Sequence, residues 1–479
     1  MVPDLNAAIG QTDVRLAATA SALLAAVWLV IGNPLVAIAI SGAPLALLIA
    51  IRKPFQLCLV FVALSFFRLH EAFPQLYAFK LPLIIGALCL FALAWHVVIE
   101  RTITPVWPTE LKWFAALFAW PTVGMVFAVN RAVAVGYWSD VFSKIGIMTL
   151  AIAWLMRGTK EINQATRMIV ISSALVSLVA FHNQLNQVGL VLGGRVTVGR
   201  NLNSPLGDPN DLALALLLPL SFAMTIAIKR TGAVNRLLGR VAVPGILWCI
   251  IATQSRGGLI GVFAVFAVIG MRMIRSRLLV AALGAALILV LAVATNIAVR
   301  PDLGNSLGGL DDSALDRIRA WHAALNMAFD RPLFGVGLSN FPESMYFYSE
   351  RWSNFRDMAA HSTWLTVLAE TGLPGFIAFI GMIIAMFKSL TRSMAKLADA
   401  NAPQIATAMA VSLLAGLCGF CAAGTFLTQA FTWPIYIMLA LTVAIGRYAE
   451  EAKAASPINV HTDGYRNVRL GALASGARS

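Results

Sequence analysis

Charged residues are scarce in this chain. Asp, Glu, Lys and Arg make up 12% of its 479 residues, whereas a soluble globular domain carries roughly 25%. Hydrophobic residues make up 59%, and the mean hydropathy is +0.79. The composition excludes a soluble domain of any size and indicates that most of the chain lies in lipid.

Cysteines are also few, and their positions exclude a disulfide framework. All five lie inside apolar runs and none lies in a polar loop: Cys58, Cys89, Cys249, Cys418 and Cys421. Cys418 and Cys421 have the spacing of a redox motif, but glycine and alanine surround them. We expect close helix packing there.

A cleavable leader is not expected either. The first 13 residues are polar without a basic segment, and no small-residue cleavage site follows the first apolar run.

The chain has long, continuous apolar runs instead. A membrane-spanning helix needs about 20 apolar residues, and only helices and closed barrels satisfy their backbone in a bilayer. We therefore predict an all-α, polytopic membrane protein with about 14 spans, or about 12 if the short run at 55–67 and some neighbouring pairs are not full spans. The runs lie near 14–31, 35–51, 55–67, 82–98, 111–128, 141–156, 168–187, 211–228, 241–254, 259–274, 278–295, 363–387, 405–428 and 431–448.

Lysine and arginine set the expected orientation, because cytoplasmic loops are enriched in them. The larger share of the 36 falls on one side of the predicted spans. Both termini lie on that side, so we expect residues 1–448 to be integral to the membrane, 296–360 to form a large exterior loop, and 449–479 to be a cytoplasmic tail. The net charge of +14 then reflects topology and contact with anionic membrane lipids. Nucleic-acid binding is not expected.

Two short exterior segments carry arginines. Arg195 and Arg200 precede Asp208-Pro209-Asn210-Asp211, which is typical of a turn and helix N-cap. Arg256 lies in the tight turn 254–258 and either contacts phospholipid headgroups or holds a phosphate through its planar fork. Lys80, a single cation at the start of a span, has the same two options.

The long exterior loop contains a third basic group. Arg317 and Arg319 begin an amphipathic stretch whose apolar spacing predicts a helix on the membrane surface. The two arginines either pair with the neighbouring Asp311, Asp312 and Asp316 or bind a ligand. No second cluster supports metal binding by these acids, so we expect neither a metal site nor a cofactor.

His361 follows this loop and opens the run at 363–387. An imidazole fixed at a helix start is either a structural hydrogen-bonding group or a proton acceptor near neutral pH. Glu370, nine residues later, points to the opposite helical face and is not expected to orient it.

Taken together, these motifs resemble the O-antigen ligase superfamily, which also contains O-antigen polymerases and some protein O-oligosaccharyltransferases. The resemblance rests on the order and common exterior location of five segments within about 190–390: Asp208-Pro209-Asn210, the Ser-Arg-Gly-Gly turn at 255–258, Arg317-x3-Trp321, the run at 332–337, and His361-Ser362-x2-Leu365-x6-Gly372.

The resemblance implies a metal-independent, inverting glycosyltransferase in the bacterial inner membrane. Its donor is a glycan on undecaprenyl diphosphate, and its acceptor is a hydroxyl of lipid A–core or of another glycan or protein. His361 is then the base on the periplasmic side, and Arg256 and Arg317 hold the diphosphate, with Arg319, Lys80, Arg195 and Arg200 as further candidates.

Two rival functions stay open. An O-antigen or exopolysaccharide polymerase would use the same motifs with a second lipid-linked glycan as acceptor. A polysaccharide or lipid transporter would also be basic and polytopic, but it typically carries charges near the midplane of broken helices. Here the predicted spans are nearly free of charge.

Overall fold

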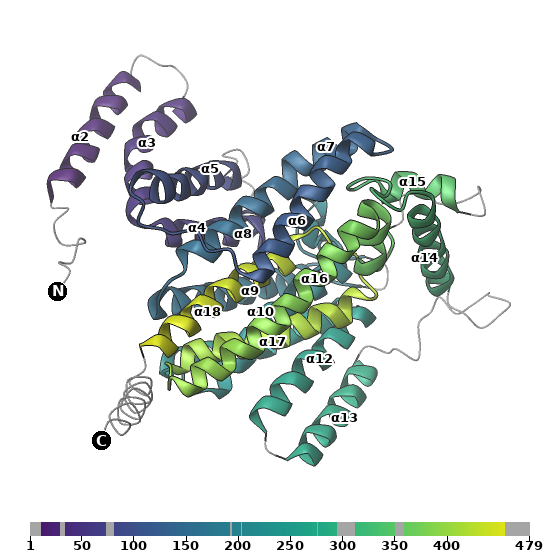
Figure 1. The fold of residues 1–479 in the computed structure, drawn as a ribbon. Helices are drawn as coiled ribbons and strands as arrows, with labels where there is room; N and C mark the ends of the chain where they lie inside the picture. The colour runs from purple at the N-terminus through teal and green to yellow at the C-terminus, as the bar shows by residue number, and fades with distance from the viewer. Residues whose placement is uncertain are drawn as a thin grey trace, which may run out of the picture.

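The computed structural model describes residues 11–28, 34–72, 81–191, 194–202, 204–274, 276–294, 312–349 and 359–455. These residues contain no β-strand, and helices account for most of them (Figure 1). The prediction of an all-α, polytopic membrane protein is confirmed.

The helices follow the apolar runs. They are α2 (Gln11–Trp28), α3 (Pro34–Arg52), α4 (Pro54–Ser65), α5 (Leu81–Ala94), α6 (Thr109–Gly124), α7 (Arg131–Tyr137), α8 (Ser143–Leu155), α9 (Thr159–Leu185), α10 (Pro209–Ile228), α11 (Ala233–Ala252), α12 (Arg256–Met273), α13 (Arg277–Ala294), α14 (Asp312–Asp330), α15 (Phe341–Tyr348), α16 (Thr363–Asp399), α17 (Gln404–Gly424) and α18 (Trp433–Ala454).

Fewer helices meet the length of a full span than the sequence predicted. Every predicted run overlaps a helix, but among the described residues eight helices are long and apolar enough to cross a membrane, or up to nine if one bent pair counts as a span. That pair is Ser41–Arg52 and Pro54–Ser65, which meet at 109°. Pro54 starts the second helix, because proline has no N–H to continue the first. The 16-residue α6 also falls short of about 20 residues.

Helices α10, α17 and α18 form the centre of the bundle, and most of their residues are buried. Small residues allow α12 and α17 to approach closely: a Cβ on Gly261 would lie 3.1 Å from the Gly419 carbonyl oxygen, and one on Gly419 would lie 3.2 Å from that of Gly261. Small residues near Cys418 and Cys421 therefore pack closely, as predicted. All five cysteines are free thiols.

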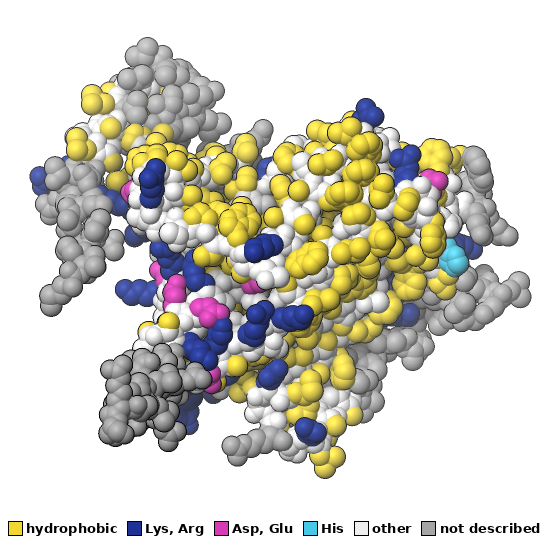
Figure 2. All heavy atoms as spheres, in the orientation of Figure 1, with side chains coloured by type: hydrophobic (Ala, Val, Ile, Leu, Met, Phe, Trp, Pro, Cys, Tyr) yellow, Lys and Arg dark blue, Asp and Glu magenta, His cyan; other side chains and the backbone are white. Residues whose placement is uncertain are grey.

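The two ends of the bundle differ in their connections. One end, here called the loop end, holds α14, α15 and the connectors 186–208, 253–255, 359–362 and 425–432. The opposite end, here called the basic end, holds the short connectors 156–158, 229–232, 274–276 and 400–403 and the last turn of α18 (Figure 1). Figure 2 shows Lys and Arg side chains gathered near the end of α18, whereas the side of the bundle is largely hydrophobic.

Candidate functional site

His361 lies at the loop end, immediately before α16. Its backbone adopts φ +48°, and Ser362 caps the helix by accepting a hydrogen bond from the Leu365 N–H. Thr363 Oγ1 donates to the Leu427 carbonyl at 2.7 Å and accepts from the Gln429 N–H at 3.1 Å. These bonds join the start of α16 to the α17–α18 connector, so the imidazole is carried by a fixed segment.

Two charged groups from other helices act on His361. Burial and the nearby Arg317 guanidinium lower the pKa of His361, and the Asp208 carboxylate opposes them. Arg317 comes from α14 and Asp208 from the start of α10. A lowered pKa leaves the imidazole neutral at pH 7, which is the form that accepts a proton.

Arg317 reaches this position because α14 packs on the loop end. Trp321, one turn after Arg317 on the same helical face, has its ring 6.4 Å from that of Phe426 in the α17–α18 connector. Trp321 Nε1 is buried and has no hydrogen-bond partner in the part of the chain that the structure describes. The Arg317-x3-Trp321 spacing thus gives this end of the bundle a cation and an N–H donor.

Asp208 is the N-cap of α10, as its sequence predicted. Its carboxylate accepts from the N–H groups of Asn210 at 2.7 Å and Asp211 at 3.3 Å. Asp208 has a second effect besides capping the helix, because the same carboxylate raises the pKa of His361. That proximity could not be predicted from the sequence, because Asp208 and His361 lie at the starts of two helices far apart in the chain.

Asn210 connects the segment before α10 to the turn before α12. Its Oδ1 accepts from Arg195 Nη2 at 3.0 Å and from Ser255 Oγ at 2.9 Å. Arg195 Nε also donates to the Thr253 carbonyl at 2.9 Å. Arg195 therefore braces the turn that presents Arg256, and the side chain of Arg256 is exposed at the start of α12.

The other arginines predicted to bind phosphate, Arg200 and Arg319, are both exposed and make different contacts. Arg200 is exposed at the loop end and donates to the Gly207 carbonyl at 3.2 Å. Arg319 is exposed and pairs with Asp316 at 3.1 Å, which is the surface ion pair considered from the sequence. Lys80, Asp311 and most of the loop before α14 lie outside the described residues.

The glycine-punctuated run at 332–337 docks against a break in α16. Gly372 has φ +67° and ψ −172° and interrupts the helix. The carbonyl groups of Ala369 and Glu370 accept from the N–H groups of Val336 at 2.8 Å and Gly337 at 3.1 Å. The run thus supplies hydrogen bonds to backbone groups near the break.

Further contacts lock this run in place. The Leu373 N–H donates to the Pro332 carbonyl at 2.8 Å, and Trp120 Nε1 donates to the Leu333 carbonyl at 3.0 Å. The Phe334 ring stacks between those of Trp120 and Phe127, at centroid distances of 4.7 and 4.4 Å. Because α14 ends at this run, its attachment to α16 fixes α14 relative to His361.

Glu370 is a second anchor on the same loop. Its buried carboxyl accepts from the Ser339 N–H at 2.9 Å and the Phe341 N–H at 3.2 Å. It does not orient His361 through any contact that the structure shows, in line with its predicted opposite face, and it holds the start of α15 instead.

One polar residue at the loop end was not predicted from the sequence. Gln429, in the α17–α18 connector, hydrogen-bonds the Asp211 carboxyl and accepts from Thr432 Oγ1 at 2.5 Å. A glutamine between two apolar helices was the available signal. As for metals, the described residues contain no group of three or more His, Cys, Asp or Glu side chains arranged to hold an ion.

Residues 241–380 match the family model described as O-antigen ligase. The matched segment runs from α11 to the middle of α16 and contains Arg256, Arg317, Arg319 and His361. No curated protein matches the chain. The resemblance of the sequence motifs to the O-antigen ligase superfamily is confirmed over this segment.

Proposed function

Because residues 241–380 match the O-antigen ligase family model, we propose that the protein is an inverting glycosyltransferase that ligates O-antigen to lipid A–core. The family match supports glycan transfer of the ligase or polymerase type. The donor in this proposal is a glycan on undecaprenyl diphosphate. Transfer takes place at the loop end, on the periplasmic side of the bacterial inner membrane, and both termini are cytoplasmic.

His361 acts as the general base. The acceptor hydroxyl oxygen attacks the anomeric carbon of the donor, the bond from that carbon to the phosphate oxygen breaks, and the hydroxyl proton passes to the imidazole. Polyprenyl diphosphate leaves, and attack opposite to the leaving group inverts the anomeric centre. General-base catalysis typically contributes about 10²–10⁴-fold.

The leaving diphosphate gains negative charge as the bond breaks, so cations held in place before the reaction lower the barrier. Arg317 and Arg256 are the main candidates for this role. Arg317 comes from α14, which the docking of residues 332–337 fixes relative to His361. Arg256 lies at the turn that Arg195 and Asn210 brace. Trp321 Nε1 is an additional donor, and Arg200, Arg319 and Lys80 remain candidates for parts of the donor further from the bond. No metal ion or cofactor is part of the proposed step.

The observation that carries the proposal is the grouping of His361, Arg317 and Asp208. Arg317 and Asp208 come from segments far from His361 in the chain, and both act on its imidazole. A neutral imidazole can remove the proton of the acceptor hydroxyl, and the cation beside it can stabilise the diphosphate leaving group. A transporter does not require this arrangement, since its charges typically line a pathway near the midplane.

The acceptor separates the ligase from its alternative, a polymerase of O-antigen or exopolysaccharide; protein O-glycosylation would use the same site. The test is the surface glycolipid profile of a strain lacking the protein, with the wild-type gene restored as control. Loss of all polymer on lipid A–core, with lipid-linked polymer accumulating, is the result expected. A single repeat unit on lipid A–core would identify a polymerase, and an unchanged profile would contradict both.

A further inference from the structure

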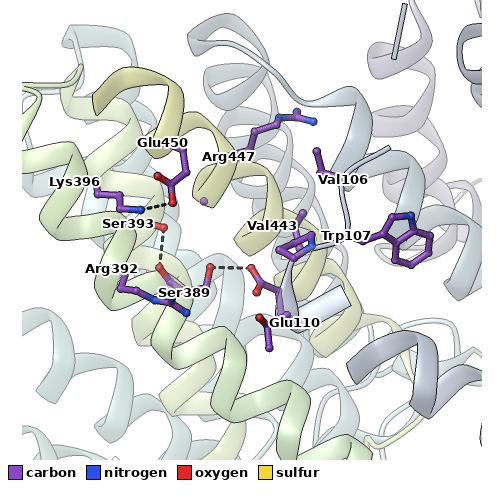
Figure 3. Close-up of a pocket in the computed structure, with 13 residues that line it drawn as sticks. Val106, Trp107, Glu110, Ser389, Arg392, Ser393, Lys396, Val443, Arg447 and Glu450 are labelled. Atoms are coloured by element: carbon purple, nitrogen blue, oxygen red, sulfur yellow. Dashed lines mark hydrogen bonds and ion pairs between the residues drawn. The ribbon is translucent and has the colours of Figure 1, made fainter. Parts of the chain in front are cut away.

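A cavity lined by charged, hydroxyl and apolar side chains lies at the basic end, between the start of α6 with the residues before it and the last turns of α16 and α18 (Figure 3). Its volume is about 480 Å³. His361 precedes the other end of α16, and Ser389, the first cavity residue on this helix, follows the break at Gly372 by 17 residues, which extend about 25 Å at 1.5 Å per residue. The cavity is therefore separate from the candidate transfer site.

A buried carboxylate forms part of its wall. Glu110 is 3% exposed, and its Oε1 accepts from Ser389 Oγ at 2.8 Å. Ser393 Oγ donates to the Ser389 carbonyl at 2.7 Å, so the two serines extend the polar wall along α16. A carboxylate removed from water requires a cation or several hydrogen-bond donors. The neutral Ser389 hydroxyl supplies a single donor.

Cations lie on the same wall, one or two helical turns further along. Arg392 is exposed and uses Nε to bond the Lys388 carbonyl at 3.0 Å, which leaves its two terminal nitrogens for another partner. Lys396 pairs with Glu450 and joins α16 to α18 (Figure 3). Arg447 Nη2 donates to the Met156 carbonyl at 2.5 Å. Within reach of the cavity, Arg392 is thus the cation with most hydrogen-bonding capacity to offer a ligand.

Two tryptophans lie at the cavity, as is typical of the depth of the lipid headgroups. Trp107 lines the cavity and is 47% exposed, and its ring lies 5.6 Å from that of Trp154. Trp154 Nε1 donates to the Val106 carbonyl at 3.1 Å. Tryptophan side chains collect at membrane–water interfaces, so a ligand in this cavity can keep its acyl chains in the bilayer.

We propose that this cavity binds the phosphoethanolamine headgroup of a membrane phospholipid, with the phosphate on Arg392 and the ammonium on Glu110. A guanidinium fork matches phosphate oxygens, and basic pockets between membrane helices bind phospholipid headgroups. The buried Glu110 disfavours a headgroup with negative charge alone and compensates an ammonium. Both ends of a zwitterionic headgroup therefore find a partner of opposite sign.

The test is native mass spectrometry of the purified full-length protein with phosphatidylethanolamine, phosphatidylglycerol and phosphatidylcholine of identical acyl chains. The wild-type protein should retain phosphatidylethanolamine most strongly. Arg392→Ala should weaken that retention about tenfold, because it removes hydrogen bonds to a charged group. Glu110→Gln, which can still accept from Ser389, should abolish the preference over phosphatidylglycerol.

Arg240→Ala is the matched control, since Arg240 is an exposed arginine of α11 outside the cavity; its retention should equal that of the wild type. Equal retention of the three lipids by the wild type, or equal losses from Arg392→Ala and Arg240→Ala, would overturn the proposal. A parallel thermal-unfolding series with soluble O-phosphoethanolamine distinguishes the sources. Stabilisation by the soluble compound with no selective lipid retention would assign the cavity to a free phosphate ester and also overturn it.

Discussion

At the scale of single residues, His361 is defined by what surrounds it. Its own helix contributes Ser362 and Thr363, which fix the backbone, whereas its protonation is governed by Arg317 and Asp208 from other helices. A base of lowered pKa stays unprotonated to a lower pH, so it works over a wider acidic range than a free imidazole.

The pH dependence of transfer tests this arrangement. A general base is active above its pKa, so the rate should fall as the pH drops through the pKa of His361. Arg317→Ala removes a cause of the lowered pKa, and the acid limb of the pH–rate profile should move to higher pH.

Asp208→Asn should shift the pKa of His361 in the opposite direction. The amide oxygen still caps α10, but the negative charge that raises the pKa of His361 is lost, so the acid limb should move to lower pH. Profiles for the wild type and both variants, measured with saturating donor, give the comparison. Shifts in the same direction for the two variants would rule out this electrostatic account.

At the scale of elements, the docking of residues 332–337 on α16 positions α14. The prediction for the element is that Gly372→Ala destabilises the protein, because a Cβ there would lie 2.4 Å from the Leu333 carbonyl oxygen and φ is +67°. With ψ −172° the backbone lies in a region that residues with a Cβ almost never adopt, which costs about 1–3 kcal/mol, and the clash adds to it.

Gly194→Ala is the comparison without a clash. Gly194 has φ +75°, and a Cβ there meets nothing within 4 Å, so only the backbone cost applies. Thermal unfolding in detergent should give a lower midpoint for Gly372→Ala than for Gly194→Ala, with Gly194→Ala below the wild type. Equal midpoints for the two variants would mean that the contact with Leu333 adds nothing.

The same element marks the limit of prediction from sequence. Hydropathy located a helix at every apolar run, and the glycines at 335 and 337 indicated a turn. The docking of that turn on the break at Gly372 was not predictable, because it consists of backbone hydrogen bonds between segments more than 30 residues apart. Among the described residues fewer helices than predicted runs have the length of a full span, since hydropathy does not detect the bend at Pro54 or the short α6.

The candidate site was partly predictable for a related reason. Motif residues such as Asp208, Arg256, Arg317 and His361 were visible one by one, and the structure brings all four to the loop end. Which of them act on one another depends on how α10, α14 and α16 pack. The bracing role of Arg195 also depends on Asn210 and Thr253, which only the fold places within reach.

At the scale of the whole molecule, the two ends of the bundle imply an orientation. We predict that cysteines replacing Arg256, Arg317 and His361 react with a membrane-impermeant maleimide on intact cells, because basic connectors stay cytoplasmic. Val234→Cys is the control for the basic end, since Val234 is 62% exposed at the start of α11.

In these experiments Val234→Cys should react only after the membrane is permeabilised. Labelling of position 234 on intact cells, with protection of 256, 317 and 361, would reverse the orientation and remove the periplasmic reaction.

The central claim is that His361 is the base for glycan transfer, and its most direct test is the transfer rate of purified His361→Ala with a polyprenyl-diphosphate-linked glycan as donor. The account predicts a rate about 10²–10⁴-fold lower, with donor binding retained because the arginines remain. Arg317→Ala, measured alongside, should weaken donor binding, transfer or both. Transfer by His361→Ala at nearly the wild-type rate would contradict the account.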